Sequence, residues 1–418
     1  MNIIRNIKGT HDILPPETKK WQNLEKIIRQ SSEQFGFEEI RTPMFEQTKL
    51  FSRSVGSDSD IVSKEMYSWD DRDGTSLTLR PELTASIARS FIQNNLKAIS
   101  PLNKLYYLGP LFRRERPQKG RQRQFHQFGV EALGSEFPEM DAEIISIAWT
   151  IILKCQLSGS TSLQLNSIGS KECREGYRDA LKNFVRPYLK EFSETSQKRF
   201  SENVLRLLDT KSDKEQIILN DAPKISKYYT KDDKKHFEKV KELLQTLRIP
   251  FSINSKLVRG LDYYSRTVFE FTSSSLGAQN AILGGGRYDN LIKDLGGKET
   301  PGIGFAAGME RFLIAMKDEY NNSHIDIYVA CILEDGLQKS LSISNELRNL
   351  GLRVTSDTLR RSLKSQMRDA NKLKSKYIII IGEEELESET FIVKDLDKGN
   401  QKTLSKSEVI ELLKNVII

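Results

Sequence analysis

The chain has 418 residues, a net charge of +7, and three cysteines that lie far apart and outside any C-x-x-C motif. This length suffices for two or three domains, and the basic excess favours a polyanionic partner. The cysteine pattern argues against a disulfide framework or a thiolate zinc site, and no apolar run reaches membrane-spanning length. Because the first residues also lack the apolar core of a secretory signal, we expect a cytoplasmic protein with no membrane partner.

Two elements are expected near the N-terminus. Apolar residues at helical spacing predict an amphipathic helix over residues 17–35, beginning after Pro15-Pro16. Residues 37–43 then predict a strand, in which Pro43 favours the edge or the end of a sheet. The pattern alone is also that of an ordinary helix–strand pair.

A hairpin is expected next, because residues 65–69 and 76–79 have strand composition and flank an Asp/Gly-rich turn. The second strand runs into Pro81, which we expect in the first turn of a helix. Glu82 and Thr84 then lie at a strand-to-helix junction. A carboxylate placed there either receives an ammonium group or favours the helix N-terminus electrostatically.

Residues 104–113 and 125–133 predict two strands that flank the strongly basic loop 114–123. By the period-two rule, one face of the second strand carries a glycine between two polar residues, in the series Gln127, Gly129, Glu131. A glycine in this position leaves space for a ligand above the sheet, although a solvent-facing polar face has the same pattern.

The middle of the chain is mainly helical by pattern, over residues 134–157 and 171–249, with a strand expected at 164–168. The second helical segment is rich in lysine and contains no catalytic cluster. Such charge runs are typical of a solvated helix face.

One Arg, one Asp and two Tyr occupy six consecutive residues, 259–264, beside a strand predicted at 267–271. Tyrosine hydroxyls on rigid apolar rings suit a pocket for a small planar ligand, and an Arg that cannot lose its charge suits an anion such as phosphate. A surface loop with a structural Arg–Asp pair is the alternative interpretation.

Residues 280–289 predict an apolar strand that ends in a glycine turn, and residues 306–316 an apolar helix that carries Glu310 and Arg311. An Arg in so apolar a helix needs either an internal carboxylate or an anionic ligand as its partner. The chain has no P-loop motif, so arginines would have to hold the phosphates of any bound nucleotide.

A polar stretch over residues 318–323 marks a domain boundary. Beyond it, strands and helices alternate, which predicts a small α/β domain over residues 324–418. Its last helix opens on the capping box Ser405-Lys-Ser-Glu408. The basic residues from Arg360 to Arg368 face either RNA or water.

Six motifs, taken in order, resemble the histidyl-tRNA synthetases, a family of class II aminoacyl-tRNA synthetases. The resemblance runs from about residue 8 to the C-terminus and is highly specific. Its motifs are Lys8-Gly-Thr-His-Asp-Ile-Leu-Pro-Pro16, Leu79-Arg-Pro-Glu82, Phe112-Arg-Arg-Glu-Arg-Pro-Gln118, Arg259-Gly-Leu-Asp-Tyr-Tyr264, Gly285-Gly-Arg-Tyr-Asp289 and Gly304-Phe-Ala-Ala-Gly-Met-Glu-Arg311.

The resemblance implies an α+β catalytic domain, built on an antiparallel sheet, over residues 1–323. It also implies a helical insertion at about 171–249 and an α/β anticodon-binding domain at 324–418. The helix and strand at the N-terminus resemble the class II motif that forms the dimer interface, so a homodimer is expected.

The implied reaction activates L-histidine with ATP and Mg²⁺, releases pyrophosphate, and transfers the histidyl group to the 3′ end of tRNA(His). The catalytic residues are then Arg113 and Arg259, and ATP binds to Arg113, Glu115 and Arg311. The implied contacts to the tRNA acceptor end come from the basic loop: Arg116, Gln118, Lys119, Arg121 and Arg123.

The implied histidine site combines residues from four segments of the chain: Glu82, Leu83, Thr84, Arg113, Gln127, Glu131, Arg259, Tyr263 and Tyr264. Leu83 stands where bacterial relatives often have glycine. No protein metal ligands are expected, because the four histidines, His11, His126, His236 and His324, have no metal-ligand spacing.

Two other functions are weighed against this one. A synthetase-like regulatory subunit of ATP phosphoribosyltransferase resembles the same catalytic domain, but the intact stretch 259–264 and the full C-terminal domain argue against it. A generic basic RNA-binding protein would explain the charge, but not the paired pocket residues.

Overall fold

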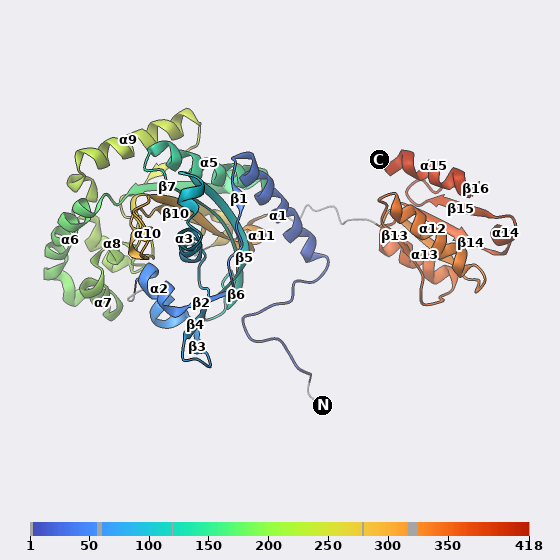
Figure 1. Ribbon diagram of the computed structural model, residues 1–418, viewed down its shortest axis with the longest axis horizontal. Helices are drawn as coiled ribbons and strands as arrows, with labels where there is room; N and C mark the ends of the chain where they lie inside the picture. The colour runs from blue at the N-terminus through green and yellow to red at the C-terminus, as the bar shows by residue number, and fades with distance from the viewer. Residues whose placement is uncertain (1–2, 57–60, 119, 278–279, 317–324, 418) are drawn as a thin grey trace. The chain divides into compact units, whose positions relative to one another are not determined.

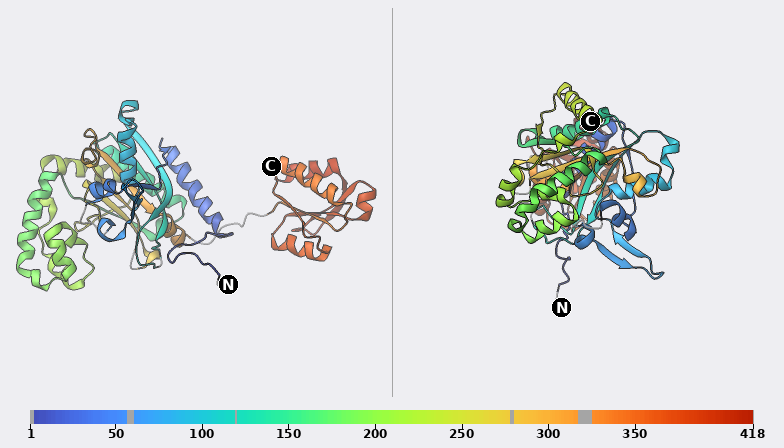
Figure 2. Two further views of the ribbon diagram at one scale, coloured as in Figure 1. Left: turned by 60° about the horizontal axis from the view of Figure 1, so that its bottom comes forward. Right: turned by 90° about the vertical axis from the view of Figure 1, so that its left-hand side faces the viewer.

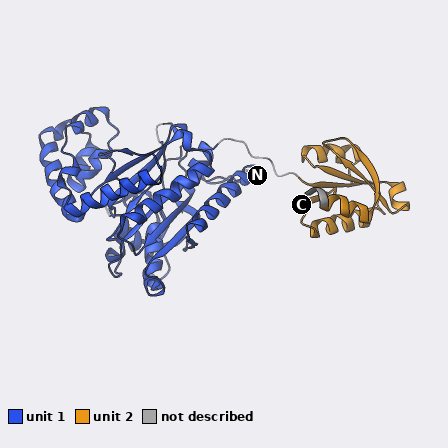
Figure 3. Cartoon of the chain, turned by 90° about the horizontal axis from the view of Figure 1, so that it is seen from above, with its two compact units in different colours: residues 1–318 blue, residues 319–418 orange. Residues whose placement is uncertain are grey.

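The computed structural model describes residues 3–56, 61–118, 120–277, 280–316 and 325–417. The chain forms two compact units, residues 1–318 and 319–418 (Figure 3). The proposed tRNA contact Lys119, the boundary expected after residue 323, and His324 lie outside the described residues. Each unit is described by itself below.

An eight-stranded sheet forms the centre of the first unit, and its six middle strands are antiparallel (Figure 1). The outermost pairs, β1–β5 and β7–β8, are parallel. This antiparallel core is the fold class expected from the sequence. Across the sheet the strands are β1 (Glu38–Glu39), β5 (Asn103–Phe112), β6 (Gln124–Leu133), β11 (Gly302–Gly308), β10 (Ala281–Arg287), β9 (Ser265–Ser273), β7 (Thr161–Ser167) and β8 (Ser252–Ile253).

A smaller three-stranded sheet holds the expected hairpin, in the order β2 (Phe45–Gln47), β4 (Ser76–Leu79), β3 (Tyr67–Asp70). The strand expected over residues 37–43 is wrong in its extent. It stops at Glu39, and the chain crosses to the smaller sheet at Phe45. The intervening Pro43 has no amide hydrogen with which to continue a ladder.

The helices of the first unit include the expected N-terminal helix, α1, which ends at Gln34 just before Gly36. The helix after the hairpin begins at Thr84 rather than at Pro81, because Glu82 precedes it and caps its amides. Outside the insertion these helices are α1 (Glu17–Gln34), α2 (Thr48–Val55), α3 (Thr84–Gln93), α4 (Leu96–Ile99), α5 (Pro138–Lys154), α10 (Leu291–Asp294) and α11 (Met309–Ala315).

The expected glycine turn near residue 285 is wrong, because Gly284, Gly285 and Gly286 lie inside the central strand β10. A Cβ on Gly285 would stand 2.2 Å from the carbonyl oxygen of Gly304 on β11, so glycine is needed there for close packing. The helix expected to begin at residue 306 begins at Met309, because the preceding residues form β11.

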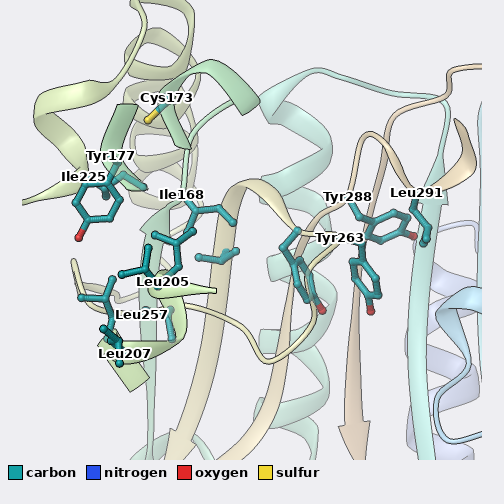
Figure 4. Close-up of a cluster of buried hydrophobic side chains, with 14 of the residues drawn as sticks. Ile168, Cys173, Tyr177, Leu205, Leu207, Ile225, Leu257, Tyr263, Tyr288 and Leu291 are labelled. Atoms are coloured by element: carbon teal, nitrogen blue, oxygen red, sulfur yellow. The ribbon is translucent and has the colours of Figure 1, made fainter. Parts of the chain in front are cut away.

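The expected helical insertion is present, and in Figures 1 and 2 its green helices lie at the end of the unit away from α1. Its α-helices are α6 (Lys171–Val185), α7 (Glu194–Glu202), α8 (Asp213–Asn220) and α9 (Lys231–Thr246). One apolar core joins the insertion to the centre of the unit (Figure 4). It runs through Tyr177, Ile225, Leu205, Leu257, Tyr263 and Tyr288. The insertion is therefore packed as part of the unit.

A buried ion pair also ties α5 to β10. Arg287, which is 0 % exposed, donates from Nε to Asp141 at 2.7 Å, and His236 of α9 lies 3.2 Å from the same carboxylate. Burial alone would raise the pKa of Asp141, but the charge of Arg287 and the hydrogen bond to His236 outweigh it and lower that pKa. This pair holds the strand from which Tyr288 emerges.

The second unit is the expected α/β domain, with sheet order β13 (Val354–Ser356), β12 (Ile327–Cys331), β14 (Tyr377–Ile381), β15 (Thr390–Asp395), β16 (Gln401–Ser405). The first three strands are parallel and the last two form the expected antiparallel hairpin. Its helices are α12 (Leu337–Asn349), α13 (Leu363–Lys372), α14 (Glu383–Glu387) and α15 (Lys406–Ile417).

Two local details of this unit bear on the sequence predictions. The capping box is confirmed, because the Ser405 amide donates to Glu408 Oε2 at 2.7 Å. α13 begins at Leu363 rather than at residue 359, since Arg360 adopts a left-handed φ of 52°. Of the basic residues at 360–368, Arg361 forms ion pairs with Asp357 and Asp369.

Candidate active site

A cavity of about 500 Å³ lies over the antiparallel sheet of the first unit. It brings together most of the predicted site residues: Glu82, Thr84, Arg113, Glu115, Arg121, Gln127, Glu131, Arg259, Tyr263, Tyr264 and Arg311. Among the described residues, Leu83, Arg116, Gln118 and Arg123 do not line it. Leu83 is instead buried in the apolar core.

Glu82 takes the helix-capping role that was the alternative prediction. Its two carboxylate oxygens accept hydrogen bonds from the amides of Thr84 and Ala85, both at 2.8 Å. Burial is the main cause of its raised pKa, and the hydrogen bonds from these amides oppose that shift. Because Glu82 also lines the cavity, a ligand's ammonium group can still approach it.

Glu131 is the most enclosed acid of the cavity, at 1 % exposed. Its carboxylate accepts hydrogen bonds from the hydroxyls of Thr84 at 2.7 Å, of Tyr107 at 3.4 Å, and of Tyr288. Burial, the largest cause, raises the pKa of Glu131 to about 8 despite these donors. Burial therefore favours the protonated form of this acid when no ligand is bound.

Sequence reasoning assigned no role to Tyr107 or Tyr288. Tyr107 shares a strand face with Gly109 and does not line the cavity, but its buried hydroxyl reaches Glu131 from the neighbouring strand. Tyr288 follows the glycine run of β10, and its ring stands 5.7 Å from that of Tyr263. Only the folded sheet brings both hydroxyls onto Glu131.

Strand glycines make room for the functional side chains. A Cβ on Gly304 would lie 1.8 Å from Glu131 Oε2, and a Cβ on Gly129 would lie 2.3 Å from the Tyr107 hydroxyl. The glycine beside Glu131 was predicted to leave space for a ligand. Gly129 instead leaves space for a tyrosine that contacts Glu131.

We expect Gly304→Ala to displace the Glu131 carboxylate and to lower kcat/KM of the reaction at this site by about 10²-fold, as misplacements near 1 Å do. Gly159→Ala is the matched control, because a Cβ there meets no atom within 4 Å. Steady-state kinetics measures both variants. Equal losses in the two, or none in Gly304→Ala, would contradict the packing argument.

Arg259 is held by a partner on the neighbouring strand. Its Nη1 lies 2.5 Å from Glu270 Oε2, and its guanidinium occupies the space that a Cβ on Gly284 would fill. The alternative interpretation, in which Arg259 and Asp262 pair within the loop, is wrong. Asp262 pairs instead with Arg206 of the insertion, at 3.0 Å. Glu270 was missed, although a lone acid in an otherwise apolar central strand is a signal for a buried partner.

A second group of arginines comes from the basic loop and from α11. Arg113 donates from Nε to the Pro81 carbonyl at 2.9 Å and stacks on Phe125 at 5.2 Å. Arg311 donates from Nη1 to the Ala281 carbonyl at 2.5 Å, and burial lowers its pKa, with a further contribution from the charge of Arg121. These arginines are oriented by backbone carbonyls before any anion arrives.

The cavity therefore combines two chemistries. Buried acids and hydroxyls from α3, β6 and the 259–264 loop can bind a small polar group with several hydrogen bonds. Arginines from the end of β5, the basic loop, the 259–264 loop and α11 can bind phosphates and stabilise charge that develops on them.

Comparison with known proteins places this arrangement in a family. The family model described as histidyl-tRNA synthetase matches residues 9–312. The chain belongs to the histidyl-tRNA synthetase family. The model of the anticodon binding domain matches residues 326–416, which form most of the second unit.

Relatives match this synthetase over nearly its full length. The histidine–tRNA ligase of Protochlamydia amoebophila is 43% identical and covers 97% of this chain and 98% of its own. That of Thermotoga petrophila is 44% identical, with 98% of each chain covered. The structure of the apo Staphylococcus aureus histidyl-tRNA synthetase covers 99% of this chain and 100% of its own, at a TM-score of 0.84 and 34% identity.

A structure titled as an ATP phosphoribosyltransferase regulatory subunit/histidyl-tRNA synthetase, from Bacillus halodurans, is 21% identical, with a TM-score of 0.67. It covers 91% of this chain and 98% of its own, and it shows the shared fold alone. The full-length ligase relatives favour an ATP-dependent histidine–tRNA ligase over the regulatory-subunit alternative. In the described part of the chain, no helix has the length and apolar character needed to cross a bilayer.

Proposed function

We propose that this cavity performs both steps of histidine–tRNA ligation. The observation that carries the proposal is the enclosed Glu131 network beside the arginines that line the same cavity. Such a site holds an amino acid through its side chain and leaves its carboxylate toward positive charge.

Histidine binds on the Glu131 side. Glu131 and Tyr264 hydrogen-bond the two imidazole nitrogens, while Glu82, Thr84 and Gln127 hold the ammonium group. Tyr263 supports Tyr264, since their ring centroids are 4.7 Å apart. Leu83 contributes its backbone only, because its side chain is buried in the core.

In the first step a histidine carboxylate oxygen attacks the α-phosphorus of ATP. A new O–P bond forms, the bond from the α-phosphorus to the bridging oxygen breaks, and pyrophosphate leaves with that electron pair. The carboxylate is already ionised, so the step needs alignment and positive charge rather than a general base. Arg113 and Arg259 supply that charge at the α-phosphate, and Arg311 binds the γ-phosphate.

Acidic side chains on the side of the cavity where the phosphates are proposed to bind fit Mg²⁺. Glu115 and Glu310 line the cavity, and Mg²⁺ needs few protein ligands when phosphates and waters supply the rest. Bound there, Mg²⁺ would neutralise phosphate charge. Glu115 also orients Arg121, whose Nη1 lies 3.2 Å from its carboxylate.

In the second step the terminal ribose hydroxyl oxygen of tRNA(His) attacks the histidyl carbonyl carbon and forms an ester bond. The bond from that carbon to the phosphate oxygen breaks, AMP leaves with the electron pair, and the hydroxyl proton is released to water. Arg116 and Gln118 are exposed on the basic loop, as contacts to a tRNA acceptor end require. Arg121 lines the cavity, and Arg123 packs on Gly9, so these two contact the end of the acceptor or position the loop. Lys119 is proposed to bind a phosphate.

The protein is proposed to act as a cytoplasmic homodimer. The exposed rings of Phe45 and Trp69, 6.2 Å apart on β2 and β3, form an apolar patch suited to a second copy of the chain. The three cysteines are free and buried, which suits a reducing compartment.

Amino-acid-dependent ATP–pyrophosphate exchange tests the reaction, with each of the twenty amino acids supplied in turn with Mg²⁺. We expect exchange with histidine alone, because apolar rivals would leave the Glu131 network unpaired. Exchange followed by rapid transfer of another amino acid to tRNA would contradict the selectivity. A folded protein that binds histidine but exchanges with no amino acid would contradict the ligase function.

A further inference from the structure

A second cavity, of about 180 Å³, lies on the insertion side of the 258–264 loop. Its walls come from α6, from the turn η4 (Val204–Asp209) and from that loop. The apolar side chains of Ile168 and Leu205 line it, and Figure 4 shows both in the core between the insertion and the sheet. The volume equals that of about six water molecules, which is room for a small anion and its waters.

The lining is strongly basic, with five cationic and two anionic side chains: Lys171, Arg174, Arg178, Arg206 and Arg259 against Glu175 and Asp262. Three of the cations are paired. Lys171 lies 3.9 Å from Glu175 at the exposed rim, Arg206 pairs with Asp262, and Arg259 pairs with Glu270.

Arg174 and Arg178 remain, and in the part of the chain that the structure describes neither has a carboxylate within ion-pairing distance. The two carboxylates whose charges act on Arg174, Asp233 and Asp289, are already engaged. Asp233 accepts hydrogen bonds from Ser170 at 3.0 and 2.9 Å, and Asp289 pairs with Arg287 at 3.3 Å. Two like charges four residues apart on one helix repel each other, and partial burial strengthens the repulsion.

Hydrogen bonding supports the same conclusion. Arg178 Nε is buried and, among the described residues, has no hydrogen-bond partner, although buried donors are ordinarily satisfied. Burial, followed by the neighbouring charge of Arg178, lowers the pKa of Arg174. An anion between the two guanidinium groups would remove both the repulsion and the missing hydrogen bond.

We propose that this second cavity binds a phosphate group between Arg174 and Arg178. Arg174 donates to the Tyr264 carbonyl, so a phosphate here would also hold the loop that forms one wall of the main cavity. The phosphate comes either from the backbone of a bound tRNA or from a free anion such as inorganic phosphate or pyrophosphate. The argument rests on this cavity's own geometry and does not require the proposed reaction.

The test is a titration of the full chain with inorganic phosphate, followed by calorimetry or phosphorus NMR. Histidine together with an ATP analogue that has a methylene group between the α- and β-phosphorus, whose own binding is measured first, fills both sides of the main cavity and keeps phosphate out of it. Pyrophosphate exchange is followed separately on every variant, so a failure of the proposed reaction is recognised independently.

We expect Arg178→Gln to weaken phosphate binding about tenfold or more, and Arg178→Lys to weaken it less. Arg186→Gln, an exposed arginine just after α6 that lines neither cavity, is the matched control and should leave binding unchanged. The melting temperature of each variant shows whether it is folded. No phosphate binding to the parent, or equal binding by folded Arg178→Gln, would overturn the proposal.

The salt dependence of tRNA(His) binding shows whether the phosphate in the second cavity comes from the tRNA backbone or from a free anion. If a tRNA phosphate occupies the cavity, Arg178→Gln should reduce the slope of log K against log salt by roughly 0.7–0.9, the value for one lost phosphate contact. An unchanged slope together with lost phosphate binding assigns the cavity to a free anion.

Discussion

Arg259→Ala should slow histidine-dependent adenylate formation by about 10²–10³-fold and change KM for ATP much less. The guanidinium is already oriented by Glu270 and lies over Gly284, so its charge is in place before the phosphate charge builds up. Interactions that strengthen only in the transition state raise kcat rather than affinity. Rapid-quench measurement of adenylate formation, with kcat and KM taken from pyrophosphate exchange, checks the result.

Arg259→Lys is the matched variant, because it keeps the charge but loses the planar fork of donors. It should recover part of the rate. Removing Arg259 leaves Glu270 without its ion pair, so the melting temperature of both variants must be recorded beside the rates. Adenylate formation by folded Arg259→Ala at the parental rate would refute the assigned role.

The second large effect concerns Glu131→Gln, which we expect to weaken histidine binding by about 10²-fold. The amide keeps the volume but only one acceptor oxygen, whereas Thr84 and Tyr288 donate to different oxygens of Glu131, and it cannot become the carboxylate that pairs with the imidazole N–H. Equilibrium dialysis with histidine measures the loss. Unchanged affinity would remove Glu131 from the histidine site.

The same substitution should also change how the free energy of unfolding depends on pH. Burial raises the pKa of Glu131 from 4.5 to about 8, so the folded state binds more protons than the unfolded state between these values. The free energy of unfolding of the parent therefore falls as pH rises from 4.5 to about 8, and Glu131→Gln removes this fall. Without ligand, the variant should exceed the parent in stability by at most about 5 kcal/mol above about pH 8, with the difference vanishing near pH 4.5.

Urea unfolding at the two ends of that window measures the difference. Glu136→Gln, at an exposed acid shortly after the same strand, is the control and should show no such dependence. A parent and a Glu131 variant with parallel stability profiles would show that the acid is ionised in the folded protein throughout this range.

Local patterns in the sequence were enough to predict several elements. The apolar spacing of α1, the turn residues of the β3–β4 hairpin and the capping box at Ser405 each depend on residues a few positions apart. Intrinsic preferences and side-chain-to-backbone bonds act over that range, so the structure agrees with them. The order of the family motifs likewise needed no coordinates.

Contacts between distant segments were decided by the tertiary structure alone. The three hydroxyls on Glu131 come from residues 24, 47 and 157 positions away, and local patterning cannot specify such partners. The glycines of β10 suggested a turn, because the permissive backbone of glycine is the same signal whether it serves a turn or close packing. Whether a glycine serves a turn or close packing depends on the carbonyl and the side chain that the neighbouring strand places against the glycine. Those neighbours are set only when the sheet assembles.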